Sequence, residues 1–152
     1  MTIEFRKMSL LDLDQVNEIE LSSFAEPWKK EDLAREIMSN EFAHIYVGEI
    51  SLEDGSKKIV SFYDFWITFD SATICQIATD KAYRNKGIGM LMMNEIVSDC
   101  YAARVSNLTL EVRKNNEKAR NLYKKCGFKE VLEKPQYYPN GEDAIYMIRE
   151  MI

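Results

Sequence analysis

The chain has 152 residues, of which 46% are hydrophobic and 30% charged, the balance of a folded globular protein rather than a disordered or membrane-embedded one. No repeat or linker-like segment interrupts it, so we expect a single domain over residues 1–152. A net charge of −5 at pH 7 argues against binding nucleic acid through a basic surface. The start lacks a signal peptide and no apolar run approaches the roughly 20 residues of a membrane span, which predicts a cytoplasmic protein without a membrane partner.

The chain contains three cysteines, Cys75, Cys100 and Cys126, which are widely separated and include no C-x-x-C pair. His44 is the one histidine that could join them at a metal. We therefore expect neither a disulfide framework nor a metal site.

The first half of the chain predicts a strand, two helices and then three strands. Strand-forming residues occupy Ile3 to Met8, and Ser9 with Asp12 three residues later has the spacing of a capping box that opens a helix. A second, short helix is expected after Pro27-Trp28. Segments rich in β-branched and aromatic residues then predict a meander, with a hairpin turn at Glu53-Asp54-Gly55, over residues 43–50, 59–66 and 73–79.

The second half alternates helices with strands. Apolar residues at helical spacing predict a helix from Gly87 to Ala103, and strict alternation of apolar and polar residues predicts a strand from Asn107 to Arg113. Asn115 or Asn116 can cap a further helix, which Gly127 would end. Two closing strands are expected over residues 128–132 and 144–151. This order predicts an α+β (mixed α/β) fold around one central sheet.

The most specific local feature is the turn from Arg84 to Gly89, with the pattern R-x-x-G-x-G, between a buried-looking strand and a helix. Glycines at 87 and 89 let a ligand approach the backbone, and the first N–H groups of the helix form an anion site. The pattern is neither a dinucleotide fingerprint nor a P-loop. The alternative is a glycine-softened turn with solvated Arg84 and Lys86.

These residues resemble the Gcn5-related N-acetyltransferases (GNAT), whose cofactor motif is Q/R-x-x-G-x-G/A at the start of a helix. Further segments resemble, in the same order along the chain, the RimI-type ribosomal-protein alanine N-acetyltransferases of that superfamily: Ser23 to Trp28, Leu110 to Arg113 with Asn116, Leu122 to Phe128, and Tyr137-Tyr138 with Gly141 to Ala144. The resemblance implies the GNAT fold, a twisted mixed sheet with helices on both faces, and an enzyme that transfers acetyl from acetyl-CoA.

The resemblance also assigns roles to individual residues. The backbone of Ile77, Ala78 and Thr79 would pair with the pantetheine arm. The pyrophosphate would lie on Arg84, Asn85, Lys86, Gly87, Ile88 and Gly89, and Asn116 would contact the cofactor further along. Glu111 would accept a proton and Tyr123 would donate one, while Trp28, Tyr137 and Tyr138 would line the peptide cleft. Two departures from the family pattern are Asp64, in a strand where many relatives have glycine, and Thr79, which replaces a usual valine.

Elementary chemistry supports these roles but leaves alternatives open. An α-ammonium group has a pKa of about 8 and must lose a proton before it attacks a thioester. Glu111 alternates away from its apolar strand neighbours, and partial burial would raise its pKa, but it is equally suited to a surface ion pair with Arg113 or a lysine. Tyr123 could be a core aromatic. Cys75 and Cys126 lack an evident activating histidine and are better explained as buried small hydrophobes.

The function expected from the sequence is acetylation of the N-terminal alanine of a small-subunit ribosomal protein, by direct attack in a ternary complex. Partners would be acetyl-CoA and the ribosomal protein's N-terminal peptide, without nucleic acid, and the protein would be a monomer or weak dimer. Within the same fold, the alternatives are another protein N-terminus, a polyamine or a small amine. From another class, the alternative is a non-catalytic acyl-CoA-binding sensor.

Overall fold

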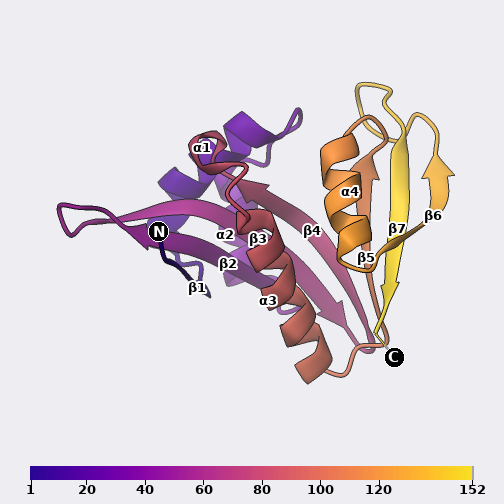
Figure 1. The fold of residues 1–152 in the computed structure, drawn as a ribbon, viewed down its shortest axis with the longest axis horizontal. Helices are drawn as coiled ribbons and strands as arrows, with labels where there is room; N and C mark the ends of the chain where they lie inside the picture. The colour runs from indigo at the N-terminus through magenta and orange to yellow at the C-terminus, as the bar shows by residue number, and fades with distance from the viewer. Residues whose placement is uncertain (152) are drawn as a thin grey trace. The chain divides into compact units, whose positions relative to one another are not determined.

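The computed structural model describes residues 1–151, and within them the elements follow the predicted order (Figure 1). The strands are β1 (Ile3–Lys7), β2 (Ala43–Ser51), β3 (Lys57–Thr68), β4 (Ser71–Thr79), β5 (Asn107–Arg113), β6 (Lys129–Lys134) and β7 (Ala144–Glu150). The α-helices are α1 (Leu13–Ser23), α2 (Lys30–Met38), α3 (Ile88–Ala102) and α4 (Glu117–Lys125), and two 3-10 turns are η1 (Leu10–Asp12) and η2 (Lys81–Tyr83). The predicted strands and helices are confirmed, with ends that move by a few residues.

The strands form one mixed sheet in the order β1-β2-β3-β4-β5-β7-β6. The pairs β1–β2, β2–β3, β5–β7 and β6–β7 are antiparallel, whereas β4 and β5 are parallel. This topology confirms the mixed α/β fold class.

The predicted helix after Ser9 begins differently from the expectation. A 3-10 turn precedes α1, because the Asp12 carboxylate accepts hydrogen bonds from the Ser9 backbone N–H (2.8 Å) and from Arg6 (2.8 Å). The turn η2 was not predicted; the Asp80 side chain begins it by accepting from the N–H of Ala82 at 2.9 Å. Both turns depend on short side-chain bonds to the backbone that compete with regular helix.

The chain divides into two compact units, and each is described by itself. The first comprises Met1–Trp66 and Cys75–Met92, and the second comprises Ile67–Ile74 and the chain from Met93 onward. β4 and α3 each contribute residues to both units. The expectation of a single domain stays a prediction.

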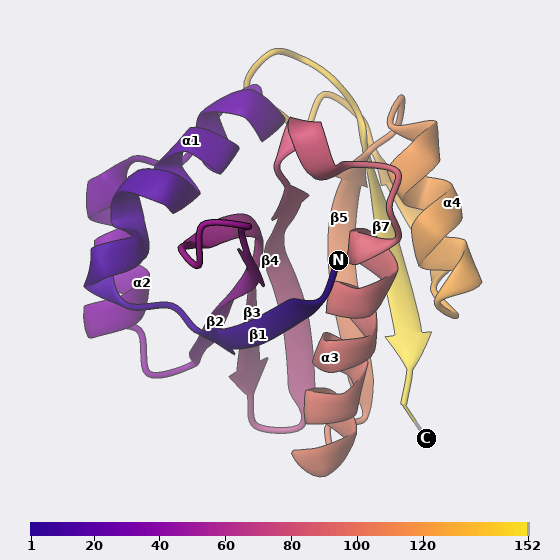
Figure 2. The same ribbon diagram turned by 60° about the vertical axis from the view of Figure 1, so that its left-hand side comes forward.

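The core of the first unit lies between the helices α1 and α2 and the strands β2 and β3. Figure 2 shows α1 and α2 side by side next to these strands. Val16 and Ile19 from α1 and Leu33 from α2 pack in one apolar cluster with Val47 and Phe62, all at most 2% exposed. Burial of such side chains is worth roughly 1.5–3 kcal/mol each, which fixes both helices on the strands.

In the second unit, β5, β7 and β6 form an antiparallel sheet that has α4 alongside it in both views (Figures 1 and 2). Leu108, Leu110 and Val112 of β5 are buried, as the alternation predicts. Glu111 is exposed and therefore points to the opposite face of β5. No helix formed by residues 1–151 is long and apolar enough to cross a membrane.

Candidate active site

The glycine turn lies in the first unit, between the end of β4 and the start of α3. Residues 84–87 are exposed, and α3 begins at Ile88, directly after Gly87. Asn85 and Gly87 have positive φ angles of 64° and 82°, a backbone conformation that glycine adopts without strain. A Cβ atom built on Gly87 would meet nothing within 4 Å, so the approach to the first turn of α3 is open. This geometry suits an anionic group at the positive end of the helix.

Arg84 has a structural role in this turn. Its Nε donates to the main-chain carbonyl of Thr79 and its Nη2 donates to the Ser23 hydroxyl, both at 3.0 Å. The guanidinium therefore ties the turn to the end of β4 and to the last residue of α1. A purely solvated Arg84, the alternative considered above, is wrong.

Substitution Gly87→Val is expected to weaken acetyl-CoA binding at least tenfold, because a branched side chain would occupy the space through which a phosphate must approach. The measurement is the acetyl-CoA dissociation constant by calorimetry. Valine at a positive φ also strains the backbone, and Gly55→Val is the matched control: Gly55 has a φ of 87° and equally open surroundings, but lies in the β2–β3 hairpin. If both variants bind acetyl-CoA equally well, the turn is not part of the site.

The residues assigned to pantetheine form the end of β4 in the first unit. Ala78 packs in the apolar core, whereas Ile77 and Thr79 are half-buried and point to the other face of the strand. The parallel pairing of β4 with β5 covers Ser71 to Thr73 with Asn107 to Thr109. Ile77 to Thr79 lie beyond its last pair, which suits backbone groups that would pair with a ligand.

Glu111 lies in the second unit and accepts two hydrogen bonds. Tyr137 Oη donates to its Oε1 at 3.0 Å, and Lys134 Nζ donates to its Oε2 at 2.9 Å. The Glu111 side chain is 29% exposed. Its contact with Lys134 is an ion pair with a lysine, which was one of the alternatives that the sequence allowed for Glu111. The hydrogen bond to Glu111 raises the pKa of Lys134, which keeps the lysine charged. Arg113, the other expected partner, pairs with Glu142.

The loop between β6 and β7 carries Tyr137 and Tyr138 and is held by Arg113. The Arg113 Nη1 donates to Asn140 Oδ1 at 3.1 Å and to Glu142 Oε2 at 3.0 Å, and its guanidinium lies 3.9 Å from the centre of the Tyr138 ring. The two tyrosine rings meet edge to face, with centroids 5.2 Å apart. Tyr137 is 48% exposed, so its ring is available to a peptide.

Tyr123 and Asn116 belong to α4 and its cap. Tyr123 is buried beside Phe128, with ring centroids 6.1 Å apart, and burial raises its pKa, which keeps the phenol protonated. Its core-packing role is therefore real, and its proton-donor role stays a prediction. Asn116 caps α4: its Oδ1 accepts from the N–H of Ala119 at 3.2 Å. The contact of Asn116 with the cofactor stays a prediction.

A buried polar cluster in the first unit was not predicted. Glu20 of α1 is fully buried, and its Oε2 accepts from the backbone N–H of Trp28 (3.1 Å) and from Gln76 Nε2 (3.2 Å). Burial raises the pKa of Glu20 to about 7, although both hydrogen bonds oppose that shift. The sequence contained an indication that Glu20 is buried, because Glu20 occupies the same helical stripe as Val16 and Ile19.

Asp64 of β3 is also fully buried, and its pKa is raised to about 9, first by burial and then by the neighbouring Glu36. No described residue donates a hydrogen bond to either Asp64 oxygen. The raised pKa favours the protonated, neutral form of Asp64 at pH 7. Burial opposes ionisation of Glu36 too, but bonds from Asp64, Asn40 and Trp66 outweigh it and lower its pKa.

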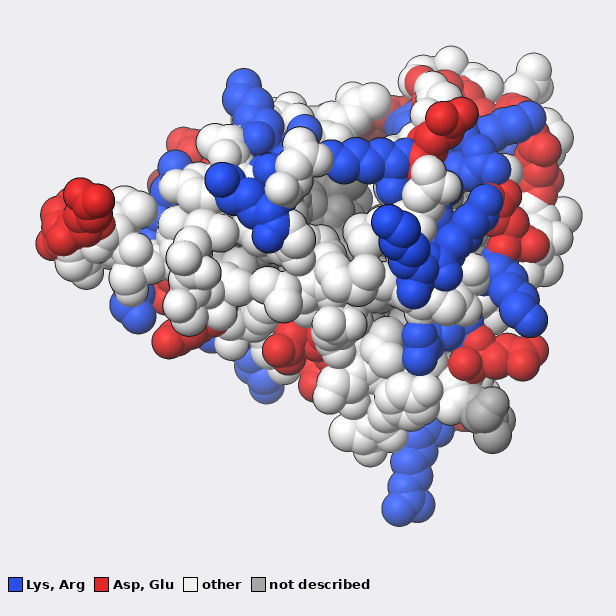
Figure 3. Space-filling view, in the orientation of Figure 1, with Lys and Arg blue, Asp and Glu red and all other residues white. Residues whose placement is uncertain are grey.

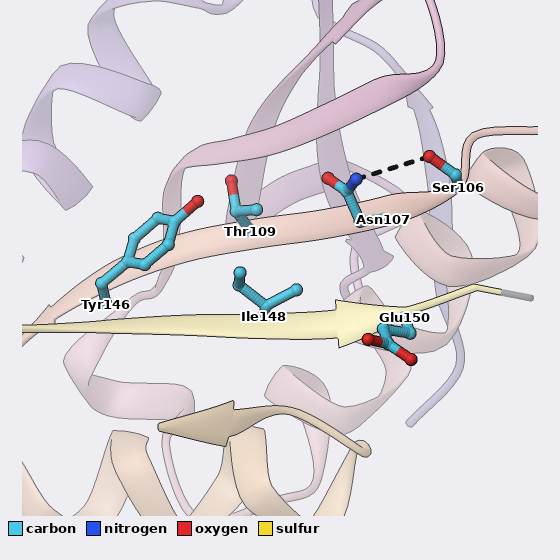
Figure 4. Close-up of a pocket in the computed structure, with 6 residues that line it drawn as sticks. All are labelled: Ser106, Asn107, Thr109, Tyr146, Ile148 and Glu150. Atoms are coloured by element: carbon cyan, nitrogen blue, oxygen red, sulfur yellow. Dashed lines mark hydrogen bonds between the residues drawn. The ribbon is translucent and has the colours of Figure 1, made fainter. Parts of the chain in front are cut away.

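A hollow on the sheet of the second unit has in its lining Tyr146, the β7 residue that pairs with Glu111 of β5. Figure 4 shows side chains of β5 and β7 lining it, among them Thr109, Tyr146 and Ile148. None of the predicted site residues lines this hollow. Surface charge is also uneven: Figure 3 shows acidic side chains at the tip of the β2–β3 hairpin and basic ones gathered over α4.

Each unit thus brings together part of the predicted set. In the first unit, Arg84 joins the glycine turn to Thr79, and Glu20 joins Trp28 to the strand that carries Ile77. In the second, Glu111, Tyr137 and Tyr138 form one contact group. Within residues 1–151 there is no group of three or more His, Cys, Asp or Glu side chains that could hold a metal ion.

The first unit thus carries an open turn at a helix start that suits an anionic group, and the second carries a carboxylate bonded to a tyrosine loop. The chain belongs to the Acetyltransferase (GNAT) family, whose model matches residues 13–128. It is accordingly an acetyl-CoA-dependent N-acetyltransferase.

Individual relatives agree with that assignment. The chain is 38% identical over 143 residues to a Bacillus subtilis (strain 168) protein provisionally named a [ribosomal protein bS18]-alanine N-acetyltransferase, covering 93% of this chain and 91% of that one. The crystal structure of the ribosomal-protein-S18-alanine N-acetyltransferase from Escherichia coli superposes with a TM-score of 0.86 at 28% identity, covering 99% and 94% of the two chains. Arabidopsis thaliana NAA60 in complex with acetyl-CoA shares the fold, with a TM-score of 0.86 at 17% identity and 98% and 99% coverage.

Proposed function

We propose that this enzyme acetylates the N-terminal alanine of a small-subunit ribosomal protein. The observation that carries the proposal is the similarity, over nearly the whole chain, to proteins named for that reaction. The structure supports it with an exposed aromatic loop bonded directly to Glu111. As partners we infer acetyl-CoA and the N-terminal peptide, without nucleic acid, for a cytoplasmic monomer or weak dimer with a net charge of −5.

The proposed reaction is direct attack in a ternary complex. The ammonium group of the acceptor replaces Lys134 as a donor to Glu111, which takes one proton directly or through a water. The free amine then attacks the thioester carbonyl, the C–N bond forms and the C–S bond breaks. Tyr123 gives its proton to the departing CoA thiolate. The attacking nitrogen, which is positively charged after the C–N bond forms, loses one proton to Tyr123 or to solvent as the neutral amide forms, and Glu111 releases its proton to solvent.

A covalent acetyl-cysteine route is disfavoured by the state of the thiols. Burial raises the pKa of Cys100 to about 12 and also raises the pKa values of Cys75 and Cys126. A thiol in that state supplies almost no thiolate at neutral pH, and the thiolate is the nucleophile. We therefore infer that no acetyl group is carried by the enzyme itself.

For the co-substrate, we propose that the first turn of α3 and residues 84–89 hold the pyrophosphate. The open space at Gly87 and the exposure of residues 84–87 support this placement. The backbone of Ile77 to Thr79 would hold pantetheine. Asn116, which caps α4, would contact the cofactor further along.

The acceptor class can be tested by competition. We expect an alanine-starting peptide of the ribosomal protein to be acetylated in preference to the same peptide with a blocked N-terminus and a free lysine, and to spermidine. The α-amine has a pKa about 2.5 units below that of lysine, so its deprotonation at neutral pH costs roughly 3 kcal/mol less. Mass spectrometry of each product gives the ratio.

Two outcomes would point to the alternatives. Preferential modification of the lysine or of spermidine would remove the ribosomal assignment but leave the acetyltransferase standing. Tight acetyl-CoA binding without transfer to any of the three would favour a non-catalytic acyl-CoA sensor.

A further inference from the structure

We propose that Glu20 is a positioning residue of the acceptor side: its buried carboxylate holds the segment that carries Trp28 against β4, directly before the residues assigned to pantetheine. The inference rests on the proposed function in one respect, because it takes the Trp28 segment to contact the acceptor. Its structural part, that Glu20 holds Trp28, stands on contacts within the first unit alone.

The contacts come from three separate parts of the unit. Glu20 is in the last turn of α1, Trp28 lies in the connection to α2, and Gln76 is in β4. One oxygen, Glu20 Oε2, accepts from the Trp28 N–H at 3.1 Å and from Gln76 Nε2 at 3.2 Å. Because Gln76 immediately precedes Ile77, this single atom connects the proposed acceptor segment with the proposed cofactor strand.

Burying a carboxylate to make this connection is energetically unfavourable. We infer from this that the charge of Glu20 has a function. Glu20 is fully buried, and its second oxygen Oε1 accepts no hydrogen bond from any described residue. The amide oxygen of Gln76, which is 7% exposed, is likewise without a donor within residues 1–151. Leaving a buried acceptor without a donor destabilises the fold, because the atom has lost its hydrogen bond to water.

The surroundings of Glu20 are acidic rather than basic. Asp32 of α2 and Asp64 of β3 both interact with its charge, and no ion pair is recorded for Glu20 in the described part of the chain. Arg84 contacts α1 one turn later, at Ser23, and not at Glu20. With burial raising its pKa to about 7, Glu20 changes charge in the neutral range.

Protonation changes the connection in a defined way. The ionised carboxylate makes charge-assisted bonds to both donors, which are about twice as strong as neutral ones. A protonated Glu20 would instead present an O–H group, which the unpaired Gln76 oxygen can accept. We therefore expect Trp28 to be held firmly above pH 7 and more loosely below it.

The test follows Trp28 itself. The chain has two tryptophans, so Trp66→Phe leaves Trp28 as the single tryptophan, which is excited selectively at wavelengths that the tyrosines do not absorb. In that background we expect quenching of Trp28 by acrylamide to rise as pH falls from 8.5 to 5.5, with a midpoint near 7. Glu20→Gln should abolish this pH dependence, and Glu20→Ala should give at least twofold stronger quenching at every pH. Glu18→Ala, at an exposed glutamate of the same helix, is the matched control and should behave as the parent.

A kinetic measurement tests whether Glu20 affects binding of the acceptor peptide. In the wild-type background, Glu20→Ala should raise KM for the alanine-starting peptide at least tenfold with the acetyl-CoA dissociation constant within twofold of wild type. Unchanged quenching and KM in Glu20→Ala, or an unchanged pH profile in Glu20→Gln, would overturn the proposal. If Glu20→Ala does not fold, the fluorescence test uses Glu20→Gln and also Gln76→Leu, which removes one of the two donors to Glu20. If the quenching results are as expected but the parent enzyme acetylates no peptide, the positioning role is supported and the proposed function is what fails.

Discussion

Substitution Glu111→Gln is expected to lower turnover by about 10²–10⁴, the usual contribution of a general base, with little change in acetyl-CoA affinity. Glutamine keeps the shape: its carbonyl oxygen can accept from Lys134, and its NH₂ group can donate to the Tyr137 hydroxyl, in place of the two bonds that Glu111 accepts. It cannot take a proton from the acceptor ammonium. Steady-state kinetics with the alanine-starting peptide and calorimetry with acetyl-CoA measure the two quantities separately.

The pH profile distinguishes lost basicity from lost structure. Above the acceptor's pKa of about 8 the amine is already neutral, so much of the lost turnover should return between pH 7 and pH 9. Glu133→Gln is the matched control, because Glu133 is likewise a half-exposed glutamate with a lysine partner, Lys114 at 2.6 Å. Full activity of Glu111→Gln at neutral pH would show that another group is the base.

Asp64→Asn is expected to stabilise the protein at neutral pH by about 2–4 kcal/mol. Asp64 is fully buried with a pKa raised to about 9, so the folded protein binds a proton that the unfolded chain, with a pKa of about 3.9, has already lost at pH 7. Its contribution to stability is complete below pH 3.9 and is lost as pH rises through the pKa near 9. Asparagine is neutral at every pH and keeps the shape of the protonated carboxyl.

Urea unfolding at pH 5 and pH 8 measures this effect. The stability gap between Asp64→Asn and the wild type should widen by about 2–4 kcal/mol from the lower to the higher pH. Asp70→Asn, at an exposed aspartate, should show no such widening. A gap that stays constant with pH would mean that Asp64 is already ionised in the folded protein.

Local patterns carried much of the prediction. The alternation of Leu108, Leu110 and Val112 placed Glu111 on the opposite face of β5, and the structure confirms it. Asn116 caps α4 as its position before the helix indicates, and Gly87 adopts the positive φ that its turn requires. These features depend on residues within a few positions of each other, where side-chain type and backbone preference are coupled directly.

Other features depended on distant parts of the chain. The bond between Gln76 and Glu20 spans 56 residues, and the bond between Tyr137 and Glu111 spans 26. Whether Glu111 would be buried or paired with a lysine could not be decided before β6 brought Lys134 to it. Asp64 was visible as a departure from the family pattern, but its partner Glu36 is on a helix that packs there only in the folded chain.

The sequence by itself thus determined the order of helices and strands, the glycine turn before α3 and the enzyme family, because each of these depends on short segments with their own propensities or motifs. Only the tertiary structure decided which polar groups are buried together and which of them hold protons. The pKa of a carboxyl group depends on its burial and on charges a few ångströms away, and those neighbours come from elements that are remote in the chain. Glu20 and Asp64 show this most clearly, since both are ordinary acidic residues in the sequence and buried carboxyls with pKa values of about 7 and about 9 in the fold.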